Sequence, residues 1–301
     1  MGTKIEMVAF SKPIFNLFRK RAIDLIASAS KKCLKKAGAD PNLMDMLIYT
    51  GIYRDEHIAE PAIASLIQKM IGANPLSQNG NSTFSFDLNN GGCGLVSGMQ
   101  LVDGFIQSGK IHQGMIVTGD AEPFRNLSKS FSYVPAAATI ILSATNNGSG
   151  FTRFKTFTFP QFKDSFESHV SWESWKKKGR MRNVLLVNKK ENYLDWCVQC
   201  TMLSLKNFLK EAKLHLDDID LILPSQSPKG LISKLIDQIG MADRIIEVES
   251  NGGELHTAGP AIALEKVWNN GRFKQSRNIL FLTVGSGITT ALALYKNSSR
   301  K

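Results

Sequence analysis

The sequence predicts an α/β protein made of two similar halves. Short apolar runs rich in β-branched residues alternate with amphipathic stretches along the chain, as expected for buried sheets covered by helices. The same order of elements occurs twice, and each half ends in a pair of apolar runs. Internal repetition of this kind indicates a duplicated unit rather than one long open sheet.

The expected strands are short apolar runs, and the expected helices are longer segments with one apolar face. In the first half the strands are Ile5–Phe10, Met46–Thr50, Thr83–Leu88, Met115–Thr118 and Thr139–Ala144, and the helices are Phe18–Ala37, Ala59–Ile71 and Gly94–Gly109. In the second half the strands are Phe151–Phe159, Leu221–Leu223, Ile245–Val248, Ile279–Val284 and Thr290–Tyr295, and the helices are Asn192–Ala212, Lys229–Ile239 and Thr257–Trp268. Residues 160 to 182 interrupt the second copy, and we interpret them, with the run Lys176-Lys177-Lys178-Gly179-Arg180, as an inserted loop.

The repeat extends to the residue types at the turn in the middle of each half. Phe86 to Cys93 runs from a strand into a pair of glycines and then a helix, and Ile246 to Gly253 follows the same pattern. We therefore divide the chain into residues 1–148 and 149–301, related by a pseudo-twofold axis. Equivalent turns of the two halves would then face each other across that axis.

Composition restricts the classes of partner and compartment. The chain has 301 residues and 43% hydrophobic content, enough for a large core, and its net charge of +11 favours an anionic partner. An acidic carrier protein, a phosphorylated cofactor, an anionic membrane surface or a nucleic acid would fit, but scattered lysines on a solvated surface explain the charge as well. A nucleic acid is the least expected, because no basic-aromatic motif is visible. Four cysteines without paired spacing predict a reducing cytoplasm, and no segment is typical of a signal peptide or membrane span.

Cys93 is the strongest candidate nucleophile. It stands between Gly92 and Gly94, directly after an expected strand and at the start of an expected helix. Free amide hydrogens and the positive end of the helix dipole stabilise a thiolate at such a position. We therefore expect a reactive thiol with a lowered pKa.

His256 is the candidate base, because the matching turn of the second half would bring it near Cys93. The other four histidines, His57, His112, His169 and His215, are interpreted as structural. Cys197 and Cys200 form a C-x-x-C pair on an expected helix, without the further ligands that a structural zinc needs, so no metal site is predicted.

Residues Met46 to Asp120, with Phe86-Asp87-Leu88 leading to Cys93, resemble the β-ketoacyl-ACP synthase III group of the thiolase superfamily, and the resemblance resumes from Asn192 to Tyr295. It implies the thiolase fold, which has five layers in the order helix, sheet, helix, sheet, helix. In that superfamily a cysteine bears the acyl group, and a histidine with an asparagine, or two histidines, complete the site.

The resemblance can be carried over residue by residue, with departures. Cys93 matches the nucleophile, and His256 falls where the synthase III group has asparagine. Ser225 stands where that group has a catalytic histidine, and the turn Gly285-Ser286-Gly287 lacks the second cysteine of the thiolases. The stretch that helps to hold the coenzyme A nucleotide is nearly absent. Loss of one oxyanion donor at Ser225 would cost decarboxylative condensation about 2–4 kcal/mol of barrier lowering.

These observations favour acyl transfer from acyl carrier protein or coenzyme A through a Cys93 thioester, with no permanently bound cofactor. The residues implied are Cys93, His256 and Ser225 as catalytic groups, with Gly285, Ser286 and Gly287 beside the substrate. The alternative is a non-catalytic partner subunit of an active ketosynthase homologue. In either case we expect a homodimer or heterodimer formed through the apolar run Met115–Thr118, taken as an edge strand.

Overall fold

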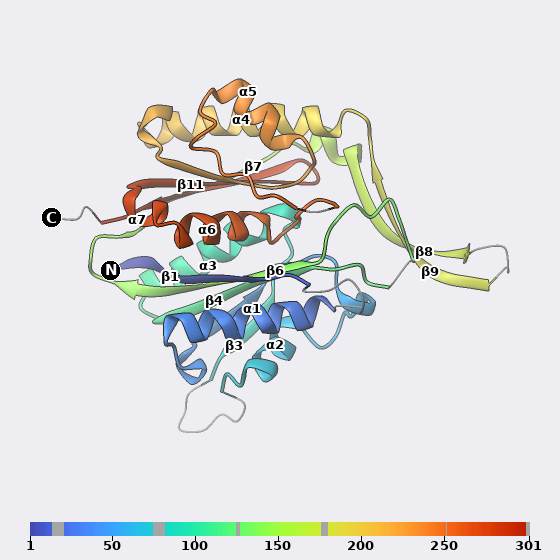
Figure 1. The fold of residues 1–301 in the computed structure, drawn as a ribbon, viewed down its shortest axis with the longest axis horizontal. Coiled ribbons are helices and arrows are strands. Elements are labelled where there is room, and N and C mark those ends of the chain that lie inside the picture. Colours follow the sequence, from blue (N-terminus) through green and yellow to red (C-terminus); the bar gives the residue numbers. More distant parts are fainter. Residues whose placement is uncertain (14–20, 75–81, 125–126, 176–179, 251, 299–301) are drawn as a thin grey trace.

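The computed structural model describes residues 1–13, 21–74, 82–124, 127–175, 180–250 and 252–298. Five layers are visible in Figure 1, with helices outside each of two sheets and a pair of helices between the sheets. This is the layer order that the resemblance implied. None of the helices in the described ranges is both long enough and apolar enough to cross a membrane.

The first sheet has the strand order β1-β6-β4-β2-β3, in which β1 and β6 pair antiparallel and β2 is parallel to both of its neighbours. Its strands are β1 Gly2–Ser11, β2 Met46–Tyr49, β3 Phe84–Asp87, β4 Gln113–Asp120 and β6 Ala136–Thr145. Helices α1 Ala22–Ala37 and α2 Ile63–Ile71 cover its outer face. The run Met115–Thr118 therefore lies inside the sheet, hydrogen-bonded on both sides, and the expectation that it forms a dimer edge is wrong.

The second sheet has the order β10-β11-β12-β7. Its strands are β7 Gly150–Thr158, β10 Leu221–Pro224, β11 Asn278–Gly285 and β12 Thr289–Lys296, covered outside by α4 Tyr193–Ala212 and α5 Leu231–Ile239. The expected strand Ile245–Val248 is reduced to one bridge, between Ile245 and Ile222 of β10. With that bridge in the fifth place, both sheets follow the same order, so the duplication is visible in the topology.

Helices α3 Gly94–Gln107 and α6 Gly259–Asn269 fill the space between the sheets, and the short helix α7 Arg272–Gln275 follows α6. Their buried side chains join residues of both sheets in one apolar cluster, to which Leu95, Met99 and Leu264 belong. Because each helix begins directly after a turn at the same end of the molecule, both turns reach the same region, where the candidate site lies.

Residues 160 to 182 are not a loop, as we had expected, but begin with a 3₁₀ turn (Pro160–Ser165) and form most of a hairpin. Its strands β8 Phe166–Trp175 and β9 Arg180–Lys189 pair antiparallel and project from the body of the molecule, with the short strand β5 Ser128–Lys129 beside β9. The lysine run 176–178 lies outside the described residues. The inner end of the hairpin carries buried Leu185 and Val187, which pack on Tyr53 and Tyr133.

Candidate functional site

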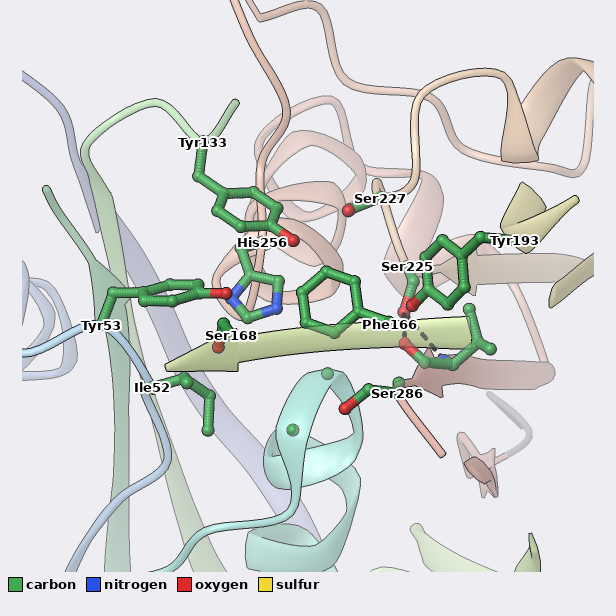
Figure 2. A pocket seen from close by; sticks show the side chains of 14 residues that line it. Ile52, Tyr53, Tyr133, Phe166, Ser168, Tyr193, Ser225, Ser227, His256 and Ser286 are labelled. Carbon is green, nitrogen blue, oxygen red and sulfur yellow. Dashed lines mark hydrogen bonds between the residues drawn. The ribbon is translucent and has the colours of Figure 1, made fainter. Parts of the chain in front are cut away.

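A small cavity lies where the turns before α3 and α6 meet the inner end of the hairpin (Figure 2). Its volume is about 60 Å³. The residues that line it are Ile52, Tyr53, Gly91, Gly92, Tyr133, Phe166, Ser168, Tyr193, Ser225, Ser227, His256, Val284, Gly285 and Ser286. Aromatic rings and serine hydroxyls therefore surround one imidazole.

Asp120, the last residue of β4, organises this region. Its Oδ1 accepts hydrogen bonds from the backbone amides of Ile52 (2.8 Å) and Tyr53 (2.7 Å). Its Oδ2 accepts from the amide (3.1 Å) and hydroxyl (2.6 Å) of Thr257, and lies 3.0 Å from His256 Nδ1. Burial opposes the ionised carboxylate, but His256 and these donors outweigh it and lower the Asp120 pKa to about 2.

The contact with Asp120 determines how His256 presents its ring. Because a carboxylate only accepts hydrogen bonds, Nδ1 is the protonated nitrogen of the neutral ring, and Nε2 is left as the base. Among the described residues no hydrogen-bond partner of Nε2 is found, and the 13% exposed side chain lines the cavity. Tyr133 and Tyr53 hold the ring, with centroids 4.4 Å and 5.3 Å from it. The arrangement is an oriented Asp-His dyad.

Cys93 does not join this site. Its side chain is 0% exposed and belongs to the apolar cluster between the sheets. The sulfur donates to the carbonyl oxygen of Thr289 at 3.3 Å, and burial raises the thiol pKa to about 12. The expectation of an accessible thiol with a lowered pKa is wrong, because desolvation of a thiolate outweighs the helix dipole at this position.

Glycine faces the cavity at the place where we expected the thiol. Gly91 and Gly92 line the cavity, and Gly92 packs on the end of β11 so closely that an added Cβ would lie 2.4 Å from the Val284 carbonyl oxygen. The Cys93 amide, which could otherwise serve as an oxyanion donor, is already bonded to the Asn90 carbonyl oxygen at 2.9 Å. In this turn both the Cys93 thiol and the Cys93 amide thus bond to backbone carbonyl oxygens, those of Thr289 and Asn90.

The other predicted site residues gather around the cavity, with one exception. Ser225 is buried and lines it, but its Oγ accepts from the Val284 amide at 3.0 Å and so is tied to β11. Gly285 and Ser286 line the cavity as well, whereas Gly287 is not among the lining residues. Cys197 and Cys200 are free and buried in α4, and no metal-binding cluster is found among the described residues.

Sequence reasoning missed several parts of the site, among them Asp120, the tyrosines around His256 and the hairpin residues. Asp120 could have been noticed, because an acidic residue at the end of a mostly apolar run must find partners there when it is buried. The hairpin residues Phe166 and Ser168 gave no such signal, since the segment was interpreted as a loop. At the rim, Lys189 of β9 donates to Glu254 of the second half at 2.9 Å and lies 5.0 Å from the ring centroid of Tyr133, which belongs to the first half, so the hairpin contacts both halves.

Comparison with known proteins agrees with this fold. The model of the 3-oxoacyl-[acyl-carrier-protein] synthase III C-terminal family matches residues 209–297. A β-ketoacyl-ACP synthase III of Clostridium perfringens SM101 is 24% identical over 281 residues, which cover 91% of this chain and 84% of the relative. One of Rickettsia bellii is 23% identical and covers 89% and 82%.

Solved structures show the same architecture. The 3-oxoacyl-ACP synthase III of Aquifex aeolicus superposes with a TM-score of 0.81 at 16% identity, covering 98% of this chain and all of that one. Xanthomonas campestris OleA (its C143S variant, with bound lauric acid and lauroyl-CoA) gives 0.79 at 14% identity, covering 99% of each chain. The protein thus has the thiolase fold. Within that fold class, its sequence resembles β-ketoacyl-ACP synthase III proteins at 23% to 24% identity.

Proposed function

We propose that this chain transfers acyl groups from thioesters of acyl carrier protein or coenzyme A directly to an acceptor, without an acyl-enzyme on Cys93. The observation that carries the proposal is the Asp120-His256 dyad, whose Nε2 has no hydrogen-bond partner within the described ranges and belongs to a side chain that lines the cavity. The relatives named β-ketoacyl-ACP synthase III support thioesters as the substrate class. No cofactor is needed for this chemistry, because the thioester itself is the activated acyl donor.

In the proposed reaction, the acceptor attacks the thioester carbonyl while His256 Nε2 takes its proton. The Asp120 carboxylate stabilises the imidazolium that forms, and the imidazolium returns the proton to the departing thiolate. One acyl-sulfur bond breaks and one bond from the acyl carbon to the acceptor forms, so atoms and charge balance. Ser225 is an auxiliary polar group, and the Gly285-Ser286 turn lies beside the thioester. Decarboxylative condensation is less well supported. It would need a second oxyanion donor at Ser225, whose hydroxyl is already bonded to Val284 of β11.

A second candidate function is a non-catalytic subunit that pairs with an active ketosynthase homologue. It is favoured by Gly92, because the close approach of Val284 leaves no room for a nucleophilic side chain at the turn. In this case the Asp120-His256 contact would hold the two halves together rather than move protons.

The test uses the full chain with acetyl-, butyryl- and octanoyl-CoA and the corresponding acyl carrier protein thioesters. Thiol release is followed in water and with alcohol, amine and thiol acceptors, and intact mass is measured in parallel. We expect release that falls by roughly 10²–10⁴-fold in His256→Ala and persists in Cys93→Ala, with no acyl adduct.

Two outcomes would contradict direct transfer. An acyl adduct that disappears in Cys93→Ala would establish covalent catalysis instead. Absence of thiol release with every donor, together with a raised activity of a homologous synthase after mixing, would establish the partner subunit.

A further inference from the structure

We infer that the outer edge of β8 is a self-association surface, on which β8 of a second copy of this chain pairs antiparallel. β8 is the end strand of the hairpin sheet, whose order is β5-β9-β8, and within the described ranges no strand pairs with its outer edge. A free edge exposes backbone amides and carbonyls that readily pair with another strand. The hairpin projects from the body of the molecule (Figure 1), so a second molecule can reach along this strand.

One face of the hairpin carries large apolar side chains that are exposed. Alternate residues of a strand share a face, and Val170 (43% exposed) and Trp172 (63% exposed) lie on the same face of β8. Met181 of β9, which pairs with Ser174, adds a third exposed apolar side chain to this face. Such a group of apolar side chains on a projecting segment indicates a contact surface.

The residues of β8 complement those of a second β8 in one register. A twofold axis through Ser171, perpendicular to the sheet, places Val170 opposite Trp172 of the second copy, and symmetry repeats this pair. A β-branched side chain opposite an aromatic ring is a favourable cross-strand pair. On the other face, the same register places His169 opposite Glu173 of the second copy. This face therefore brings an imidazole to each carboxylate.

The two neighbouring registers are less favourable. An axis at Val170 would place Glu167 opposite Glu173 of the second copy, and like charges directly opposite each other destabilise a strand pair. An axis at Trp172 would place Val170 opposite Ser174, which loses one of the apolar contacts. Charge and apolar contact thus both favour the register centred midway between these two positions.

The proposed contact leaves room for the bodies of both molecules. The inner end of β8, at Phe166, is five residues from the axis at Ser171. At about 3.3 Å per residue, the two inner ends would lie roughly 33 Å apart, with the bodies at opposite ends of the joined sheet. Because only the hairpins touch, the contact is small, and we expect it at about 100 µM and above rather than in dilute protein.

The experiment uses a cysteine at the axis. In the proposed register the residue at 171 faces its own counterpart, with the two Cα atoms about 4.5–5.5 Å apart, a distance at which a disulfide can close. Ser171→Cys is oxidised at about 100 µM, and dimers are counted by non-reducing electrophoresis and intact mass. The four native cysteines are buried, so their background is low.

Ser174→Cys is the matched control, because Ser174 lies on the same strand and is more exposed than Ser171. In the proposed register it would lie roughly 20 Å from its counterpart, too far for a disulfide. We expect disulfide dimers of Ser171→Cys to form about tenfold faster than those of Ser174→Cys. An equal or faster rate for Ser174→Cys would overturn the inference, because random collision would then explain the cross-links.

A second variant tests the apolar contact. Adding Trp172→Lys to Ser171→Cys places an ammonium group opposite Val170 and should lower the rate of cross-linking to that of the control. Trp172→Ser is the milder change should the lysine variant not fold, and melting temperatures show which variants are folded. A rate unaffected by these substitutions would refute pairing at this edge. If Ser171→Cys stays monomeric in purified protein, a second copy is not the partner of β8.

Discussion

The glycine turns of the two halves begin alike and end differently. Both have an asparagine and two glycines before a central helix. After the first turn the thiol of Cys93 is buried, whereas after the second turn the imidazole of His256 lines the cavity. The first turn is pressed on the end of β11 at Gly92, where an added Cβ would lie 2.4 Å from the Val284 carbonyl oxygen, whereas the equivalent Gly253 of the second turn is pressed on the Ser132 carbonyl oxygen, at 2.5 Å. What each turn packs against therefore decides which side chain reaches the site.

At the first turn, the residue that lines the cavity is Gly92, one position before the expected Cys93. Successive residues of a helical turn point about 100° apart, so a turn that presents Gly92 to the cavity must direct Cys93 elsewhere. In the second half the side chain of His256 is directed at the cavity because Asp120, which belongs to the first half, bonds its ring nitrogen Nδ1. The duplicated halves thus supply one site jointly.

The largest expected effect is on the contact that joins the halves. Asp120→Asn removes the buried charge and leaves five donors facing one amide, so we expect the free energy of unfolding to fall by about 3–5 kcal/mol. Urea denaturation measures this. Asp24→Asn, at an exposed position in α1, is the control and should stay within roughly 0.5 kcal/mol of wild type.

The same carboxylate predicts a pH dependence. Its folded pKa of about 2 lies below the ordinary 3.8, so its stabilisation is present above pH 3.8 and is lost as the pH falls toward 2. From that shift we expect wild type to lose about 2 kcal/mol more than Asp120→Asn over this range. Parallel pH profiles of unfolding for the two proteins would contradict the assignment.

A third prediction concerns the crowded turn. Gly92→Ala places a methyl group against the Val284 carbonyl, and we expect a loss of about 1–3 kcal/mol from overpacking. Gly104→Ala is a matched control in α3, with nothing within 4 Å of its added Cβ, and should gain roughly 0.5–1 kcal/mol. Equal effects in the two variants would show that the turn is not crowded.

Cys93 should behave as a core residue. Because its thiol is buried and its pKa is raised to about 12, an alkylating reagent at neutral pH should label it no faster than Cys33, whose pKa is also raised to about 12. Cys93→Ala should cost about 1 kcal/mol. Peptide mass mapping after timed alkylation measures the rates, and selective early labelling of Cys93 would contradict its placement.

Substitutions at the exposed edges of the two sheets should change the stability of the fold least. The two halves also differ at these edges. The first sheet ends in the strand β3, with Phe84 57% exposed, and the second ends in a single bridge. We expect the chain to dimerise through β3, and Phe84→Lys to yield monomers with nearly unchanged stability. Leu203→Lys, at an exposed position in the second half, is the control for light scattering, and an unaffected dimer would exclude this edge.

The sequence by itself determined the fold class, the repeated order of the elements, and most helices and strands. These follow from hydrophobic periodicity and glycine turns, which report local burial and local backbone geometry. Tertiary structure decided the rest. The direction of Cys93 depends on a carbonyl oxygen 196 positions away in the chain, and the setting of His256 depends on Asp120, 136 positions away. No local pattern records such contacts, because they arise only when the two halves and the hairpin pack together.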